Sequence, residues 1–147
     1  MKIGVGIIKL DIPDEDFFMV FSCPSDDSKN IFFALSEGEF DTAALCVAYC
    51  EYYTYGKLAN IEEYIWFNQV FIPELSHIHG ILLSTTQQMK VLKEYPELLH
   101  YEGKDYKTLF CIACSEKDHE TLSRLGFMDG MLSFYDNDKN FADFRQP

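Results

Sequence analysis

Basic residues are scarce in this chain of 147 residues, where 12 Lys and Arg stand against 24 Asp and Glu and the formal net charge is −12. Between Asp11 and Asp41, nine carboxylates are opposed by Lys29 alone. Binding to nucleic-acid phosphates or to an anionic membrane requires the opposite sign, so we expect neither as a partner. An acidic surface keeps a protein soluble, and it also favours fast association with a basic protein.

Long apolar segments are missing as well. No run approaches the roughly 20 residues that cross a bilayer. The first residues, MKIGVGIIKLDIPDED, lack a small-residue cleavage site and continue into acidic residues, which argues against a secretory signal. The five cysteines are an odd number, and without a signal peptide they indicate reduced thiols. We therefore expect a cytoplasmic protein.

The sequence also lacks the short motifs of common enzymes and cofactor sites. There is no G-x-S-x-G, no Walker loop and no H-E-x-x-H. The segment DNDKN, from Asp136, opens like a calcium loop, but Phe141 occupies the required glycine position and Pro147 the required glutamate position. We therefore expect no catalytic activity and no cofactor.

Hydrophobic residues (48%) and aromatic residues (16%) are abundant, and no linker or repeat divides the chain, so we expect one domain over residues 1–147. Residue spacing predicts strands at 2–10, 16–22, 31–36, 63–72, 79–84, 107–114 and 131–135, and helices at 41–55, 85–94 and 116–125. The first three strands should form an antiparallel pair or meander, and the strand at 63–72 should pair with that at 79–84. The mixture predicts an α+β fold, with helices packed on a mostly antiparallel sheet.

Helix ends carry recognisable signals. Asp41 is the expected N-cap of the first predicted helix, and Gly56 is its expected C′ residue. For the last predicted helix, Ser115 and Asp118 have the spacing of a capping box, and Gly126 is placed to end the helix. The tail after Tyr135 shows no clear periodicity.

The segment CIACSEKDHE raises the question of a metal or redox site, because Cys111 and Cys114 form a C-x-x-C motif. On a strand, a separation of three residues places the two side chains on opposite faces, which favours a structural role. A metal-binding or redox protein that uses His77 and His79 with one or more of Cys111, Cys114 and His119 remains an alternative. A homo-oligomeric structural protein is another, because the sequence does not distinguish an aromatic core from an aromatic interface.

The second half of the chain resembles a known family. Trp66 lies in an aromatic strand that Pro73 ends; then come HGILLS, a polar helix, YPEL, the pair Gly103 and Tyr106, a β-rich strand and the acidic helix start SEKDHE. Over residues 61–127 this order resembles the bacterial suppressor-of-fused-like (SUFU) domain. The resemblance implies a non-enzymatic protein-binding module, since eukaryotic relatives sequester a transcription factor and small bacterial members serve as immunity proteins beside toxins.

We therefore expect a protein-binding domain, and more concretely an immunity (antitoxin-type) protein that binds and neutralises a basic toxin. The predicted partner-binding residues are acidic and lie in the first third of the chain: Asp14, Glu15, Asp16, Asp26, Asp27, Glu37 and Glu39. Exposed rings among Tyr52, Tyr53 and Tyr55 would supply binding hot spots, although at least one of them is expected in the core. The sequence leaves the oligomeric state open.

Overall fold

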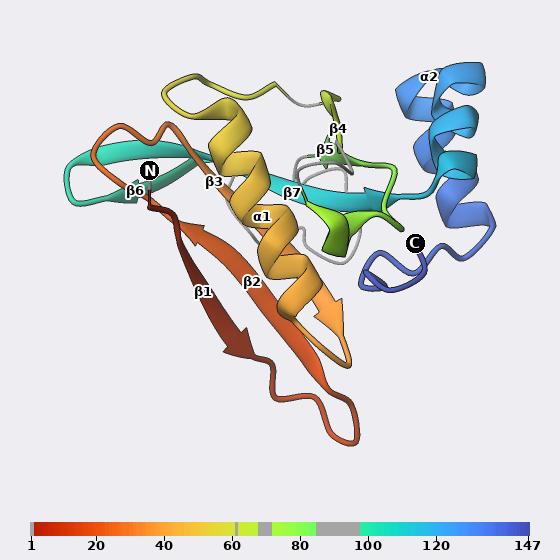
Figure 1. Ribbon diagram of the computed structural model, residues 1–147, viewed down its shortest axis with the longest axis horizontal. Helices are drawn as coiled ribbons and strands as arrows, with labels where there is room; N and C mark the ends of the chain where they lie inside the picture. The colour runs from red at the N-terminus through yellow and green to blue at the C-terminus, as the bar shows by residue number, and fades with distance from the viewer. Residues whose placement is uncertain (1, 61, 68–71, 85–97) are drawn as a thin grey trace.

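The computed structural model describes residues 2–60, 62–67, 72–84 and 98–147 (Figure 1). Its strands are β1 (Gly4–Lys9), β2 (Phe17–Cys23), β3 (Asn30–Glu37), β4 (Tyr64–Trp66), β5 (Gly80–Ser84), β6 (Leu98–Tyr101) and β7 (Lys104–Cys114). Two α-helices, α1 (Asp41–Thr54) and α2 (Glu116–Asp136), and the 3₁₀ turn η1 (Pro73–Leu75) complete the described elements. The predicted α+β class is confirmed.

The strands form one mixed sheet in the order β1-β2-β3-β7-β5-β4, with β6 paired to β7. The predicted meander of β1, β2 and β3 and the predicted β4–β5 pair are both antiparallel, as are the β5–β7 and β6–β7 pairs. The exception is the β3–β7 pair, which is parallel from Asn30 opposite Lys107 to Phe33 opposite Phe110. The sheet is therefore mostly antiparallel, as predicted, with one parallel pair at its centre.

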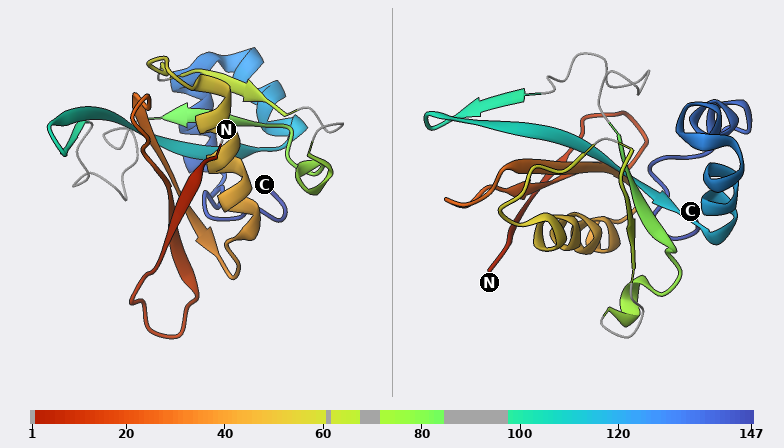
Figure 2. Two further views of the ribbon diagram at one scale, coloured as in Figure 1. Left: turned by 60° about the vertical axis from the view of Figure 1, so that its left-hand side comes forward. Right: turned by 90° about the horizontal axis from the view of Figure 1, so that it is seen from above.

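In the part of the chain that the structure describes, the two α-helices pack on opposite faces of the sheet. Helix α1 lies along one face, whereas α2 stands at one end of the sheet, beyond the end of β7 (Figure 2). The core on the α1 side contains Phe32, Leu109 and Cys111, and the smaller core beneath α2 contains Phe33, Phe110 and Cys114. Because side chains alternate along a strand, β3 and β7 supply both cores.

The face of helix α1 that packs against the sheet includes the small buried residues Ala43, Cys46 and Cys50. The predicted cap of this helix was wrong by one residue. Asp41 is the first helical residue, and the preceding Phe40 makes no side-chain capping hydrogen bond. Asp41 remains favourable there because an acidic side chain in the first turn interacts well with the helix dipole. The predicted end is confirmed, since Gly56 follows the C-cap with φ of 76°.

Helix α2 begins as predicted and breaks at Gly126, the predicted end, but a second helical segment that was not predicted follows. The Ser115 hydroxyl accepts a hydrogen bond from the Asp118 N–H, and the Asp118 carboxylate accepts one from the Ser115 N–H. Gly126 interrupts the helix with φ of 81° and ψ of 176°, after which helical structure resumes. The predicted strand at 131–135 is therefore wrong. Met131 and Phe134 are three residues apart on one helical face and pack into the core beneath α2.

Other predicted bounds also change. The strand predicted at 63–72 is shorter, with β4 ending at Trp66, and residues 68–71 lie outside the described residues. The helix predicted at 85–94 lies wholly outside them. The β6–β7 hairpin was not predicted; its turn places Glu102 and Gly103 at positive φ. Within the described part of the chain, the helices are too short or too polar to cross a membrane.

Candidate functional site

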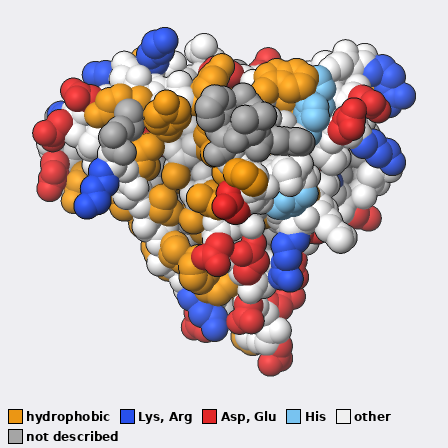
Figure 3. Space-filling model, in the orientation of Figure 1, with side chains coloured by type: hydrophobic (Ala, Val, Ile, Leu, Met, Phe, Trp, Pro, Cys, Tyr) orange, Lys and Arg blue, Asp and Glu red, His pale blue; other side chains and the backbone are white. Residues whose placement is uncertain are grey.

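The β1–β2 hairpin protrudes from the body of the protein and ends in an acidic tip (Figure 1). Asp14, Glu15 and Asp16 are exposed in the connecting loop, where Asp14 has φ of 61°. Lys9 forms an exposed ion pair with Asp16, at 3.4 Å between Nζ and Oδ1. Acidic side chains gather over this narrow end of the molecule (Figure 3).

The tip is held against the end of β3 by a backbone contact. The Gly38 N–H donates to the Asp16 carbonyl oxygen at 2.7 Å. Gly38 has φ of 82°, and a Cβ atom added there would overlap the guanidinium group of Arg145. The positive φ favours glycine at this position, whereas the guanidinium group is the end of a flexible side chain and would move aside. The contact places the carboxylates of the tip beside Glu37.

The C-terminal segment, residues 137–147, forms the other side of the site. Phe144 is buried in the α1-side core and anchors the segment. The Ala142 carbonyl oxygen accepts a hydrogen bond from the Glu37 N–H at 2.9 Å, and the Asn140 side-chain amide donates to Glu37 Oε2 at 2.8 Å. The tail that lacked periodicity in the sequence therefore packs, and it orients a predicted partner-binding residue.

Together these elements enclose a hollow of about 680 Å³, here called the acidic hollow. Its lining residues are Asp14, Glu15, Asp16, Glu37, Gly38, Asn140, Asp143, Arg145 and Gln146. Five carboxylates and one guanidinium give the lining a formal charge of −4. Four of the seven predicted partner-binding residues thus lie in one place, together with Asp143, Arg145 and their polar neighbours, which the sequence analysis missed.

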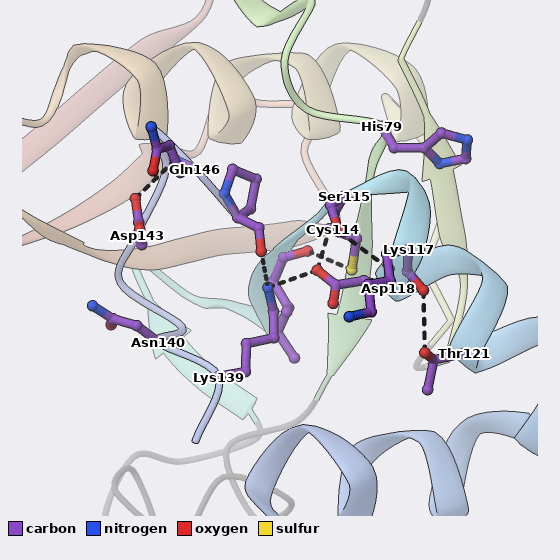
Figure 4. Close-up of polar contacts among 12 residues, drawn as sticks. His79, Cys114, Ser115, Lys117, Asp118, Thr121, Lys139, Asn140, Asp143 and Gln146 are labelled. Atoms are coloured by element: carbon purple, nitrogen blue, oxygen red, sulfur yellow. Dashed lines mark hydrogen bonds and ion pairs between the residues drawn. The ribbon is translucent and has the colours of Figure 1, made fainter. Parts of the chain in front are cut away.

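A second hollow of about 440 Å³ adjoins the first, because Asn140, Asp143 and Gln146 line both. Its base is an ion pair between Lys139 and Asp118, at 2.8 Å between Nζ and Oδ2, with 8% and 16% of the two side chains exposed (Figure 4). Lys139 Nζ also donates to the Pro147 carbonyl oxygen at 3.1 Å. Asp118 is the capping-box acid of α2, so one carboxylate joins the start of α2 to the C-terminal segment.

The other predicted acids lie elsewhere. Asp26 and Asp27 are exposed in the turn between β2 and β3, at the opposite end of β2 from the tip. Tyr55 Oη donates to Asp27 Oδ2 at 3.4 Å, and Lys104 Nζ donates to the Asp26 carbonyl oxygen at 2.7 Å. Glu39 is half-buried, and its Oε2 accepts from the Asp41 N–H at 3.1 Å. The structure therefore divides the predicted acids between the two ends of β2.

The predicted aromatic anchors are all at least partly accessible. Tyr52 and Tyr53 are 62% and 55% exposed on the outer side of α1. Tyr55 is half-buried. The expectation that at least one of the three would enter the core was wrong, because the small residues Ala43, Cys46 and Cys50 form the buried face of α1 instead.

Of the histidines predicted as alternative ligands, His79 and His119 lie together, whereas His77 has a different partner. His77 donates from Nε2 to the Phe144 carbonyl oxygen at 2.7 Å. His79 is hydrogen bonded through Nδ1 to the Tyr64 hydroxyl at 2.7 Å and stacks on His119, with ring centroids 4.7 Å apart. Burial against the rings of Tyr64 and Trp66, and the adjacent His79, lower the pKa of His119.

The thiols of the C-x-x-C motif do not converge. Cys111 lies in the α1-side core and Cys114 in the core beneath α2, which confirms the prediction that they face opposite sides of the sheet. Burial raises the pKa of Cys114 to about 12, so its thiol stays protonated and is a poor metal ligand. The His79 ring points away from the network around Cys114 (Figure 4). Among residues 2–60, 62–67, 72–84 and 98–147, no group of three or more His, Cys, Asp or Glu side chains is placed to hold a metal ion.

The remaining cysteines of the α1-side core are also shielded. Cys50 Sγ lies 3.9 Å from Cys111 Sγ, and burial raises the pKa values of Cys46 and Cys50 well above the ordinary thiol value. Cys23 alone among the five is exposed. The four buried cysteines therefore behave as small core hydrophobes rather than as reactive thiols.

The excess of negative charge around the acidic hollow favours cationic side chains. The sequence matches no family model and no curated protein. The resemblance to the suppressor-of-fused-like domain therefore remains a prediction, and the argument for function depends on the charges and contacts described above.

Proposed function

We propose that this chain is a non-catalytic protein-binding domain that captures a basic protein through the acidic hollow. In the form that the family resemblance implies, it is an immunity protein that neutralises a basic toxin. The supporting observation is that Asp14, Glu15, Asp16 and Glu37 lie around one hollow with Asp143, although they come from three separate parts of the chain.

The hollow combines charge with preorganisation. Glu37 is oriented by Asn140, and the backbone contact between Gly38 and Asp16 fixes the tip against β3. The Glu37 carboxylate, held by Asn140, therefore loses little conformational freedom when a Lys or Arg side chain binds. The excess negative charge also steers a basic protein towards the tip, an effect that screening by salt weakens over about 8 Å at physiological ionic strength.

The exposed tyrosines of α1 lie near its C-terminal end, about 17 Å along the helix from its start at 1.5 Å per residue, so they would form a separate contact. Tyr52 and Tyr53 offer accessible rings on the helix that follows Glu37 and Glu39 in the chain. Aromatic anchors supply much of the binding energy in protein interfaces, whereas charged residues at the rim contribute mostly to the association rate and to specificity.

The test compares two variants that carry the same change in charge. The tip variant replaces Asp14, Glu15 and Asp16 with Lys, which changes the formal charge of the lining from −4 to +2. The control replaces Glu120, Asp129 and Asp136 with Lys; these exposed acids lie on α2, outside the lining of the acidic hollow. Circular dichroism and thermal melts establish that both variants are folded.

Each protein is immobilised and exposed to lysate of the source cells, and retained proteins are identified by mass spectrometry after washes of increasing salt. We expect the wild type and the control to retain one basic protein at stoichiometric level, and the tip variant to lose it. With the captured protein purified, its association rate with the tip variant should fall about tenfold or more, with a flatter salt dependence. Equal association rates for the tip variant and the control would refute the assignment of the binding site to the tip.

A further inference from the structure

Among the described residues, the two helices do not cover the whole sheet. Helix α1 covers one face, and on the other face α2 covers only the end near β5 and the last residues of β7 (Figure 2). Between this end and the β6–β7 hairpin lies an apolar groove of about 550 Å³. Its lining residues are Met19, Phe21, Ser22, Cys23, Pro24, Ile31, Phe33, Leu99, Tyr101 and Thr108.

The groove is a continuation of the core beneath α2. Phe33 packs edge-on against Phe110 of that core, with ring centroids 5.3 Å apart, and also lines the groove. On the outer side, Leu99 and Tyr101 of β6 are 40% and 52% exposed. The floor is therefore rigid and buried, whereas one wall is an accessible edge strand, as in the hydrophobic grooves that bind protein segments.

Polar groups in the groove have partners already. The Ser22 hydroxyl accepts a hydrogen bond from the Phe32 N–H at 2.9 Å and is fully buried. Thr108 likewise has an interaction partner. An occupant of the groove would consequently gain by burying apolar surface rather than by hydrogen bonding to these side chains.

The end of the groove at Pro24 is acidic. Asp26 and Asp27 are the two central residues of a turn closed by a hydrogen bond from the Ser28 N–H to the Ser25 carbonyl oxygen at 3.1 Å. Both are exposed, and the ion pairs among the described residues involve neither carboxylate. The nearby Lys104 ammonium group donates to the Asp26 carbonyl oxygen rather than to a carboxylate, so both carboxylates can pair with a cationic side chain beside the apolar occupant.

From these features we infer that the groove binds a short segment of a protein partner in which an apolar side chain is followed closely by Lys or Arg. The apolar side chain lies in the groove beside Pro24, and the cation reaches Asp26 or Asp27. This inference depends on the proposed function for its choice of a protein as the occupant. It assigns a second contact to Asp26 and Asp27, two of the three predicted acids that the acidic hollow does not include.

The chain geometry sets the spacing of this recognition pattern. Pro24 lines the groove, and Asp26 follows two residues later, so at most about 7 Å of extended chain separates the apolar wall from the first carboxylate. The basic residue of the partner should therefore lie within about three positions of the apolar one.

The experiment selects phage-displayed random dodecapeptides on the immobilised full-length chain. Selected peptides are then tested by fluorescence anisotropy against the wild type and against matched variants. Leu99→Gln alters the groove, whereas Leu98→Gln alters the neighbouring residue on the opposite side of β6, where the side chain is 62% exposed. The pair Asp26→Asn and Asp27→Asn removes the charge at the acidic end.

We expect enriched peptides to share an apolar residue with Lys or Arg within three positions. Their dissociation constants should rise about tenfold with Leu99→Gln and about threefold with the Asp26 and Asp27 variant, and remain unchanged with Leu98→Gln. The inference is overturned by a lack of enrichment, by enriched peptides without this pattern, or by equal effects of the two leucine variants.

Two other occupants give different results, and either would also overturn the inference. A second copy of this chain would show as a dimer in light scattering that Leu99→Gln dissociates. The chain's own residues 85–97, which lie outside the described residues, would be indicated if peptides bound only after that segment was replaced by a Gly/Ser linker.

Failure of the groove and failure of the proposed function are distinguishable. If Leu99→Gln leaves capture of the basic protein from lysate unchanged while the tip variant abolishes it, the proposed function stands and the groove inference fails. If the selected peptides obey the predicted pattern but the tip variant still captures the protein, the groove inference stands and the acidic hollow loses its assigned role.

Discussion

Replacing Asp118 with Ala should destabilise the protein more than its position on a surface helix suggests. The carboxylate accepts from the Ser115 N–H at 3.0 Å and from Lys139 Nζ at 2.8 Å. Loss of the first contact costs about 1 kcal/mol, the usual contribution of a helix cap. Loss of the second leaves the Lys139 ammonium group, whose side chain is 8% exposed, with Pro147 as its remaining acceptor.

Removing one partner of a buried ion pair costs about 3–5 kcal/mol, mostly because the other charge remains buried. Lys139 keeps one carbonyl acceptor, so we expect the lower end, a loss of about 3 kcal/mol in the free energy of unfolding. The double variant Asp118→Ala, Lys139→Met should recover about 2 kcal/mol relative to Asp118→Ala, because no unpaired charge is left in it. Ser115→Ala, which loses one cap contact and keeps the ion pair, should cost only about 1 kcal/mol.

Urea denaturation followed by circular dichroism and by tryptophan fluorescence measures these differences. Trp66 is the single tryptophan, and its ring centroid lies 4.2 Å from that of His119 on α2, so its fluorescence reports the docking of that helix. If Asp118→Ala cost no more than Ser115→Ala, or if the double variant were no more stable than Asp118→Ala, the reasoning about the buried pair would be refuted.

Three further predictions concern other parts of the molecule. Gly38→Ala should lower the free energy of unfolding by about 1 kcal/mol or more, because alanine is strained at positive φ and its Cβ would displace Arg145; a thermal melt equal to that of the wild type would contradict this. The pKa of His119 is lowered by burial and by His79, so the unfolded state binds the proton more tightly and stability is lost as the pH falls through about 6.5. Between pH 7.5 and pH 5.5 the free energy of unfolding should therefore fall more for the wild type than for His119→Gln, as urea denaturation at each pH would measure. Equal falls for the two proteins would contradict this prediction. Under native conditions a thiol reagent should modify Cys23 alone, with the four buried cysteines reacting only on unfolding; fast reaction of a second thiol would show that the cores open more readily than described.

Local patterns in the sequence predicted much of the fold. The capping box at Ser115 and the opposite orientation of Cys111 and Cys114 both follow from the geometry of one element, and both are confirmed. The error at residues 131–135 has the same local origin, since a short apolar run fits a strand as well as a helix. Packing of Met131 and Phe134 beneath α2 decides between them.

The sequence predicted that the candidate site would be acidic, but it did not predict which acids lie together. Acidic residues near the N-terminus were identified from their density, yet their division between the two ends of β2 depends on where the hairpin turns. The role of Asn140 and Arg145 was not predictable, because both act through contacts with Glu37, about a hundred positions earlier in the chain. The apolar residues Phe141 and Phe144 were the available signal that the tail packs.

The parallel pair at the centre of the sheet has a consequence for how the chain folds. Asn30 on β3 pairs with Lys107 on β7, 77 positions later, and closing a loop of that length costs about 4 kcal/mol in chain entropy before contacts repay it. During synthesis the first three strands and α1 emerge long before β7, leaving one edge of β3 unpaired. The cost of closing this long loop should make folding slow for a protein of this size. The unpaired edge is a template for pairing with other chains, so release of the nascent chain before β7 should favour aggregation.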